Sequence, residues 1–292
     1  MPNRTSLCYN PQVLFFNQLQ GELFVILRFK HFILLAVLII TNISFVSAQE
    51  TTNKPDKKTD NKPQSTDLNK GVTAEQVAET AIILYGTRDN LNQIRKSVFE
   101  RGKINITNVE GKVETANYER RILRGDSLDK ERIRFDQEYP NAKFSLVYKD
   151  DKIFGIFNDS VFTPREDASK AFENQIWHGL EALLRYKENG ATLELAGRDK
   201  IMGVDFHLLD VTDKQNRKTR FYISARTFRA MMLEYTEDGV KYKRKFYDYN
   251  YAQGTLFPYR TILWADGKQI EETEVLTVTF GQKVEENLFQ GS

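Results

Sequence analysis

The sequence predicts an α+β fold in which a large, curved antiparallel sheet is covered by two helices. Two stretches carry apolar residues at helical spacing, and most of the remainder alternates apolar and polar residues with a period of two. The chain has 292 residues, 40% hydrophobic and 28% charged, which is the composition of a globular protein. Such a sheet has one apolar face to bury, and two helices lying across it can cover that face.

An apolar stretch near the N-terminus predicts export from the cytoplasm. Arg28 and Lys30 precede an uncharged apolar run over residues 32–46, and small residues follow up to Ala48. This order is typical of a secretory signal peptide cleaved after Ala48. We therefore interpret residues 1–48 as a signal peptide with an atypical N-terminal extension. An uncleaved membrane anchor is the alternative, although the run is shorter than the ~20 residues of a spanning helix.

The segment after the predicted cleavage site is polar. Residues 49–72 contain no aromatic residue and a single leucine, so they cannot bury enough apolar area to offset the entropy of ordering. We expect a disordered polar linker here and one folded domain over residues 73–292. The only cysteine, Cys8, lies upstream of the cleavage site, which argues against disulfides and cysteine-ligated metals. No cysteine follows the apolar run to carry a lipid, so the exported product is predicted to be soluble.

The charge of the mature chain argues against nucleic acid as a partner. Cleavage after Ala48 removes three basic residues and one acidic residue from totals of 42 and 40, which leaves 39 of each. Nucleic-acid binding normally requires a basic surface. The basic run "KYKRKF" that begins at Lys241 is interpreted as one solvated face of a strand.

A first helix is predicted to begin at Thr73. Thr73 and Gln76 have the spacing of a capping box, and apolar residues on one face follow as far as Gly86. The same face is predicted to continue the helix beyond that glycine. The residues that carry this pattern are Val77, Ala81, Leu84, Tyr85, Leu91, Ile94 and Val98.

An antiparallel meander is predicted after Gly102. Apolar residues alternate with polar ones, and turn signals such as "EGK", "YPN" and "KDDK" separate the runs. The alternating residues are Ile104, Ile106, Tyr118, Ile122, Ile133, Phe135, Phe144, Leu146 and Tyr148. The stretch "KIFGIF" is apolar on both faces, so we expect it in the middle of the sheet or beneath a helix.

A second helix is predicted between Pro164 and Gly190. Pro164 and the acidic residues after it suit a helix start, and an apolar stripe follows. That stripe consists of Phe172, Ile176, Leu180, Leu183 and Leu184. Strands then resume from Leu193 to Phe280, and the last two form a hairpin across an Asp-Gly turn within residues 257–280.

Motifs of known catalytic chemistry are missing from the sequence. We find no phosphate-binding glycine loop, no Gly-x-Ser-x-Gly elbow and no His-Glu-x-x-His helix. Asp205 and His207 share a strand face and could serve as a base and its orienter, or as two metal ligands, but a third ligand at suitable spacing is missing. We assign them a structural role and expect His178 to pack at the edge of the second helix. The protein is predicted to be no enzyme and to need neither cofactor nor metal.

Aromatic and methionine residues supply candidates for an apolar pocket. Trp177, Trp264, Met231 and Met232 have side chains that adapt to varied apolar ligands, with ordinary core packing as the alternative. Tyrosines at 247, 249 and 251 would share one strand face, a pattern compatible with carbohydrate stacking or with an exposed sheet surface.

Several stretches together resemble the LolA-like family of outer-membrane lipoprotein-sorting proteins. They include "YGTRDNLNQIRKSVFERGKI", "IWHGLEALLRY", "IMGVDFHLLDV", "TFRAMMLEY", the long hairpin with Pro258 and Gly267, and the closing "VEENLF". The resemblance covers nearly all of residues 73–292. It implies a periplasmic half-barrel, an incomplete antiparallel barrel whose concave apolar face is lidded by the helices. This chain carries more charge along its strands than a minimal carrier requires.

The resemblance also implies a function. Proteins of this type shield acyl chains from water, so we expect a monomeric, non-covalent carrier of lipid or lipoprotein acyl chains that exchanges cargo with membrane-bound donor and acceptor proteins. A sensor or scaffold that uses the same fold to bind a protein partner is the alternative. The candidate cavity-lining residues are Phe144, Leu146, Tyr148, Trp177, Leu180, Leu184, Met231, Leu233, Trp264, Leu276, Val278 and Phe280.

Overall fold

The computed structural model describes residues 71–108 and 110–290. The chain divides into two units, Met1–Gln64 and Ser65–Ser292, and all described residues belong to the second. The predicted signal peptide, its extension and nearly all of the polar linker therefore lie outside the described residues. No helix within the described ranges is long and apolar enough to cross a membrane.

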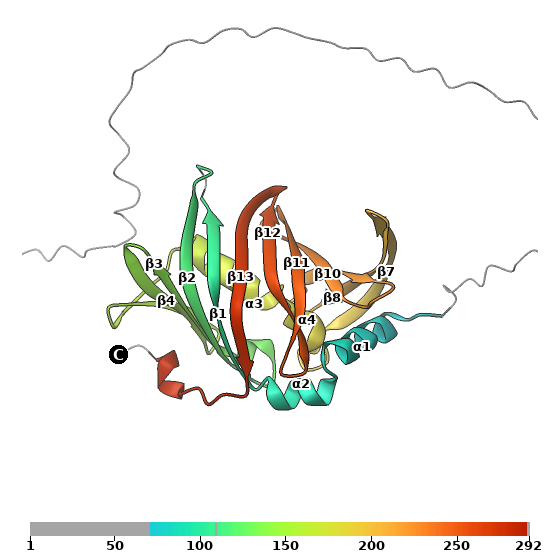
Figure 1. Ribbon diagram of the computed structural model, residues 1–292, viewed down its shortest axis with the longest axis horizontal. Coiled ribbons are helices and arrows are strands. Elements are labelled where there is room, and N and C mark those ends of the chain that lie inside the picture. The colour runs from blue at the N-terminus through green and yellow to red at the C-terminus, as the bar shows by residue number, and fades with distance from the viewer. Residues whose placement is uncertain (1–70, 109, 291–292) are drawn as a thin grey trace, which may run out of the picture. The chain divides into compact units, whose positions relative to one another are not determined.

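One antiparallel sheet of thirteen strands dominates the described residues. Its strands lie in the order β6-β5-β4-β3-β2-β1-β13-β12-β11-β10-β9-β8-β7, so β6 and β7 are two separate edges and the sheet stays open. Figure 1 shows the strands curving around α3 and α4. The strands are β1 (Ser97–Thr107), β2 (Val113–Leu123), β3 (Arg132–Tyr139), β4 (Ala142–Lys149), β5 (Lys152–Phe157), β6 (Ser160–Phe162), β7 (Thr192–Ile201), β8 (Val204–Thr212), β9 (Lys218–Ser224), β10 (Ala230–Glu237), β11 (Val240–Ala252), β12 (Thr255–Ala265) and β13 (Lys268–Phe280).

The first predicted helix is two helices, α1 (Ala74–Tyr85) and α2 (Arg88–Ile94). The predicted capping box is confirmed, because Thr73 accepts a hydrogen bond from the Gln76 N–H and the Gln76 side chain accepts one from the Thr73 N–H. Continuation to Val98 was wrong. Gly86 adopts a φ of 136°, which ends α1 in a conformation that suits glycine, and Val98 already belongs to β1.

The second predicted helix is also divided, into α3 (Glu166–Trp177) and α4 (Leu180–Leu184). The break falls at His178 and Gly179, where the backbone leaves the helical conformation. The apolar stripe predicted for one straight helix therefore serves two different parts of the core: Phe172 and Ile176 pack at one end of the sheet, and Leu183 and Leu184 at the other.

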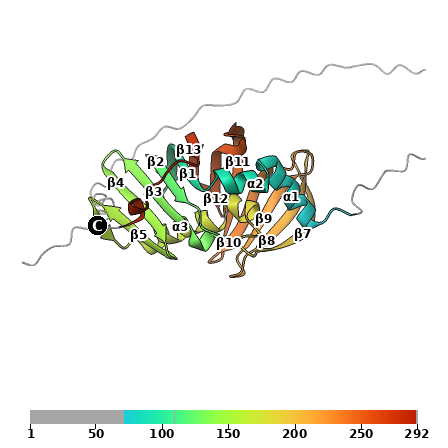
Figure 2. The same ribbon diagram turned by 90° about the horizontal axis from the view of Figure 1, so that it is seen from below.

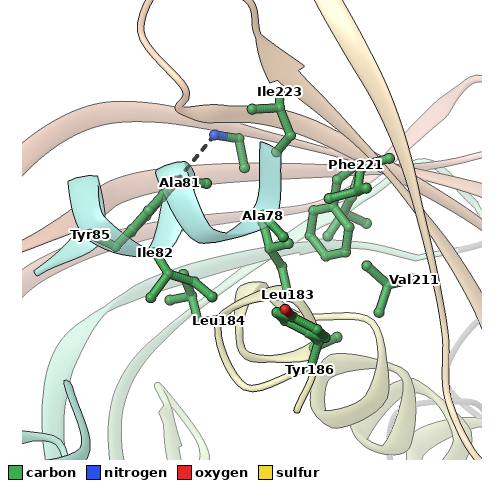
Figure 3. Packing of buried hydrophobic residues seen from close by; sticks show 14 of the residues in the cluster. Ala78, Ala81, Ile82, Tyr85, Leu183, Leu184, Tyr186, Val211, Phe221 and Ile223 are labelled. Carbon is green, nitrogen blue, oxygen red and sulfur yellow. Dashed lines mark hydrogen bonds between the residues drawn. The ribbon is translucent and has the colours of Figure 1, made fainter. Parts of the chain in front are cut away.

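The helices cover one face of the sheet, which we call the concave face; the opposite face is the outer face. Helices α1 and α4 pack together over β8, β9 and β10. Figure 3 shows Ala78 and Leu183 on the side of Phe221, and Ile82 beside Leu184. Figure 2, seen from below, shows α1 and α2 across one part of the sheet and α3 beside β3. The Tyr85 hydroxyl lies 2.7 Å from that of Tyr249 on β11 and ties α1 to the sheet.

The C-terminal hairpin predicted from the sequence is confirmed as β12 and β13, joined through Asp266 and Gly267. Beta-strand β13 pairs with β1 as well, so the last strand lies beside the first in the middle of the sheet (Figure 1). The "KIFGIF" stretch is β5, which lies next to the edge strand rather than in mid-sheet, so of its two expected places the one beneath a helix is the one found. Its outer side is apolar because Ile156 packs with Val147 and with Phe289 of the short 3-10 helix Glu286–Phe289.

Candidate functional site

A cavity of about 160 Å³ lies between the concave face and the α3–α4 pair; we call it the helix–sheet cavity. Residues from β1, β2, β3, β11, β12 and β13 form its sheet side, and α3 and α4 form the opposite side. Apolar side chains make up much of this wall. They are Val98, Ile122, Leu128, Ile133, Phe172, Ile176, Leu180, Phe246, Phe257 and Val275.

Charged side chains also line the helix–sheet cavity, which the sequence analysis did not anticipate. They are Arg95, Glu100, Arg120, Arg124, Glu131, Glu181 and Arg244. Three of them, Glu100, Arg120 and Arg244, occupy inward positions of strands where alternation would place apolar residues. Arg244 belongs to the basic run interpreted as a solvated strand face, and that interpretation is wrong for this residue because its side chain is directed inward.

Four of these charged residues and the neighbouring Arg185 form what we call the arginine–glutamate cluster. Its members are Arg95, Arg124, Glu131, Glu181 and Arg185. Glu131 Oε1 lies 2.8 Å from Arg124 Nη1 and also contacts Arg185 Nη1. Glu181 Oε1 lies 2.8 Å from Arg124 Nη2 and 3.1 Å from Arg95 Nη1. Arg95 follows α2, Arg124 follows β2, Glu131 precedes β3, and Glu181 and Arg185 lie in and directly after α4. These segments meet where β2 ends and β3 begins.

The electrostatics of the cluster follow from burial and pairing. Burial would raise the pKa of the Glu181 carboxyl, but Arg124 and Arg95 beside it hold that pKa below its ordinary value. Burial, together with the neighbouring charge of Arg124, lowers the pKa of Arg95. Burial raises the pKa of the Glu131 carboxyl above its ordinary value, although Arg124 and Arg185 offset part of that rise. The two carboxyls of the cluster are therefore shifted in opposite directions.

The cluster also borders a second cavity of about 520 Å³, which we call the outer cavity. Arg95, Arg124 and Glu181 line both cavities, so their side chains form the partition between them. The outer cavity is further lined by Arg88, Lys96, Arg185, Asp126 and Glu188, among other residues.

A chain of hydrogen bonds crosses the helix–sheet cavity from the sheet to α3. Arg120 Nη2 donates to Gln175 Oε1 at 2.8 Å, and Gln175 Nε2 donates to Glu271 Oε2 at 3.2 Å. Arg120 Nη1 also lies 3.8 Å from Glu100 Oε1 as an ion pair, and the same Glu100 oxygen accepts a hydrogen bond from the Tyr118 hydroxyl at 2.6 Å. Burial, and then the Glu100 carboxylate, raises the pKa of Tyr118, so this phenol stays protonated.

The structure places nine of the twelve candidate lining residues on the helix-covered side. Phe144, Leu146, Tyr148 and Trp177 pack with Phe172 and Ile176 of α3. Leu184 and Leu233 are core residues beneath α1 and α4, and Val278 and Phe280 pack with Val98. Only one of the twelve, Leu180, lines the helix–sheet cavity itself.

Leu276, Met231 and Trp264 lie away from the concave face. A β-bulge pairs Arg101 with Thr277 but Gly102 with Val275, so Leu276 is an extra residue whose side chain is 61% exposed. Expecting Leu276 to share a face with Val278 was therefore wrong.

Met231 and Trp264 lie on the outer face rather than on the concave face that was expected. A shift between Ala230 and Met232 leaves Met231 packed against the outer-face cluster of Phe206, Tyr222 and Met232. Arg244 points inward, so its neighbour Lys243 points to the outer face. Trp264 is paired with Lys243 and shares that outer face, where the ammonium group of Lys245 lies over its ring.

The tyrosines of β11 are separated by another irregularity. Asp248 has a φ of 52°, and the register passes from Tyr247–Arg260 directly to Tyr249–Pro258. Tyr249 consequently turns inward to bond Tyr85, whereas Tyr251 is 59% exposed. The common face required for carbohydrate stacking is not formed.

The two described histidines occupy different sites. His178 is buried at the break between α3 and α4, where Nδ1 lies 2.7 Å from Thr219 Oγ1, Nε2 lies 3.1 Å from Glu237 Oε1, and the ring stacks on Tyr235. It is thus part of the interior rather than of a helix edge. His207 is buried and stacks beside Phe228, while the Asp205 side chain is largely exposed near Lys200. In the described part of the chain, no hydrogen bond links Asp205 to His207, and no group of three or more His, Cys, Asp or Glu residues is arranged to hold a metal.

The burial of His178 predicts a loss of stability in acid. Burial lowers the pKa of His178 below 6.5, an effect that Arg217 adds to and that Glu237 and Asp213 partly offset. The unfolded chain therefore binds a proton near pH 6.5, whereas the folded chain binds it only at lower pH, and the free energy of unfolding falls as pH drops through this window. His207, whose pKa burial also lowers, adds in the same direction.

Chemical denaturation at pH 7.5 and at pH 5.5 measures this loss. We expect a smaller loss in His178→Gln than in the unchanged protein, by up to about 1.4 kcal/mol, because pH 5.5 lies about one unit below the ordinary pKa of histidine. His207→Gln is the matched control that retains the His178 contribution. Equal losses in the unchanged protein and in the double variant would contradict the assignment.

Comparison with solved structures identifies the fold. A DUF1329 family protein from Desulfovibrio piger matches with a TM-score of 0.56 at 13% sequence identity, over 75% of this chain and 97% of that chain. A LolA superfamily protein from Nitrosomonas europaea matches with a TM-score of 0.54, also at 13% identity, over 75% of this chain and 98% of that chain. The chain has the fold of the LolA superfamily.

The LolA-like fold confirms the resemblance found in the sequence. No protein-family model and no curated protein matches the sequence. At 13% identity, the two solved structures show a shared fold and nothing about individual residues of the cavity wall.

Proposed function

We propose that this protein binds the acyl chain of a lipid or lipoprotein non-covalently, in the helix–sheet cavity, and acts as a carrier in the periplasm. The observation that carries the proposal is the position of this cavity. It lies between the concave face and the α3–α4 pair, where ten apolar side chains line it. An acyl chain placed there would exchange water for apolar contacts along its length.

The volume of the cavity requires the helices to move during binding. About 160 Å³ is below the ~300 Å³ at which ligand pockets usually begin, so a whole chain needs more room than the described state offers. The break at His178 and Gly179 divides the cover into two short helices, and α3 holds to the sheet chiefly through Phe172 and Ile176. Displacing these two side chains costs roughly 3–6 kcal/mol, whereas burying a dozen methylene groups contributes roughly 10 kcal/mol.

The LolA-like fold and the predicted signal peptide support a shuttle between membranes. A carrier releases its cargo to an acceptor with higher affinity, and closure of α3 and α4 onto the sheet after release keeps their apolar residues out of water. Membrane-bound donor and acceptor proteins would be the partners of a monomeric carrier of this kind.

Filling the cavity tests this function. Leu180 lines it, so Leu180→Trp places a larger side chain in the space an acyl chain would occupy. We expect the affinity for a fluorescent fatty-acid probe to fall at least about tenfold, because overpacking opposes occupation of the site. Leu276→Trp makes the same exchange at a position 61% exposed on the outer face, and should leave the affinity unchanged.

Native mass spectrometry on protein purified without detergent provides an independent readout. A lipid or acylated peptide bound near one per chain would support the carrier. An apo mass with no uptake of the probe would contradict it, and would favour the alternative of a sensor or scaffold that binds a protein partner.

A further inference from the structure

The arginine–glutamate cluster holds more positive than negative charge in a buried place. Three guanidinium groups share two carboxylates within it. Arg95 is 7% exposed, and the side chains of Arg124 and Arg185 are 10% and 12% exposed. A further carboxylate near Arg95, that of Glu100, is already engaged by Tyr118 and Arg120. One cation is therefore left without a matching anion.

The hydrogen bonding of the cluster is incomplete at the same place. Arg95 Nε and Arg124 Nε are shielded from solvent and find no hydrogen-bond acceptor among the described residues. Arg95 Nη1 is also shielded and makes no hydrogen bond, although Glu181 Oε1 lies 3.1 Å away as an ion-pair partner. Stacking of the Arg95 guanidinium over Phe280, 4.9 Å from the ring centroid, compensates only part of the lost hydration. Buried N–H donors without acceptors are costly, and natural proteins keep few of them.

The position of these donors identifies the kind of ligand. Arg95 and Arg124 form the partition between the apolar helix–sheet cavity and the more polar outer cavity. An amphiphile with its chain in the first would bring its head group to this partition. Guanidinium groups bind carboxylate and phosphate oxygens more strongly than neutral acceptors.

We infer that the cargo is an anionic amphiphile, and that Arg95 and Arg124 bind its carboxylate or phosphate head group. The inference rests on the proposed function, since the chain of the same molecule occupies the helix–sheet cavity. The head group supplies the negative charge that Glu131 and Glu181 leave unmatched, and accepts hydrogen bonds from the free donors.

Binding of two ligands with the same chain tests the head group separately from the chain. Hexadecanoate and its methyl ester are each titrated against an apolar fluorescent probe bound to the purified protein. We expect hexadecanoate to bind at least about tenfold more tightly than the ester, because a charged acceptor replaces a neutral one. The preference should weaken as salt is added.

Variants of Arg95 assign the preference to the cluster. Arg95→Gln should lose the preference for hexadecanoate while its affinity for the methyl ester stays unchanged, and Arg95→Lys should retain part of it. Because Arg124 still pairs with Glu131 and Glu181 in these variants, the fold should persist, and thermal unfolding checks that it does. Arg101→Gln is the control, at an arginine whose side chain is 55% exposed.

The outcomes separate the two proposals. If both ligands bind equally, the head-group inference fails and the carrier function stands. If neither ligand displaces the probe, the carrier function fails. Inorganic phosphate serves as a competitor: if it binds in an Arg95-dependent way while the chain compounds show no preference, the site takes a free anion and the inference is overturned.

Discussion

Replacing Glu131 with glutamine is expected to lower the free energy of unfolding by about 3–5 kcal/mol. Glu131 is almost fully buried, and its carboxylate faces both Arg124 and Arg185. Removing its charge leaves the three buried guanidinium groups of the cluster with Glu181 as its one remaining carboxylate. Removing one partner of a buried ion pair costs more than the intact pair contributes to stability. Urea denaturation at pH 7 measures the change.

Glu138→Gln is the matched control for this loss. Glu138 lies 3.8 Å from Lys143, and both side chains are at least 60% exposed. An exposed pair of this kind contributes about 0–1 kcal/mol, so the variant should unfold almost as the unchanged protein does. If the two glutamine variants lose the same small amount, the cluster is not held together by its charges.

The architecture was predictable because alternation and turn chemistry are local properties. Thr73 and Gln76 predict the start of α1, and Asp266 and Gly267 predict the last hairpin. Each prediction rests on contacts within a few residues of sequence. The helices were too long in the prediction because apolar spacing continues across Gly86 and Gly179, where the backbone itself turns. A glycine inside a periodic stretch was the available signal for both breaks.

The candidate site was predicted less well because face assignment depends on register. An extra residue at Leu276 or Met231, or the left-handed backbone at Asp248, changes the face on which neighbouring side chains lie. Such an irregularity leaves almost no mark in the pattern of a single strand. The charged wall did have a signal: Glu100, Arg120 and Arg244 occupy positions where alternation expects apolar residues. These three charged residues can be seen as exceptions to the alternation in the sequence, but that they line one cavity is known only from the fold.

Leu233→Ala and Leu276→Ala measure this distinction between faces directly. Both residues were candidates for the cavity lining, both lie on strands of one sheet, and the substitution is identical. Leu233 is fully buried beneath α1 and α4, so its truncation should cost about 2–5 kcal/mol of the free energy of unfolding through lost burial and the space left behind. Leu276 is 61% exposed, and its truncation should change the stability by no more than about 0.5 kcal/mol.

The comparison has a consequence for binding as well as for stability. Leu233 belongs to the core that anchors α1 and α4 over β8, β9 and β10, away from the cavity wall. Its truncation should therefore weaken the cover while leaving the apolar lining intact, so the fatty-acid probe should enter and leave faster in stopped-flow exchange than in Leu276→Ala. Equal exchange rates in the two variants, with Leu233→Ala destabilised as expected, would mean that the cargo enters past α3 without movement of the α1–α4 core.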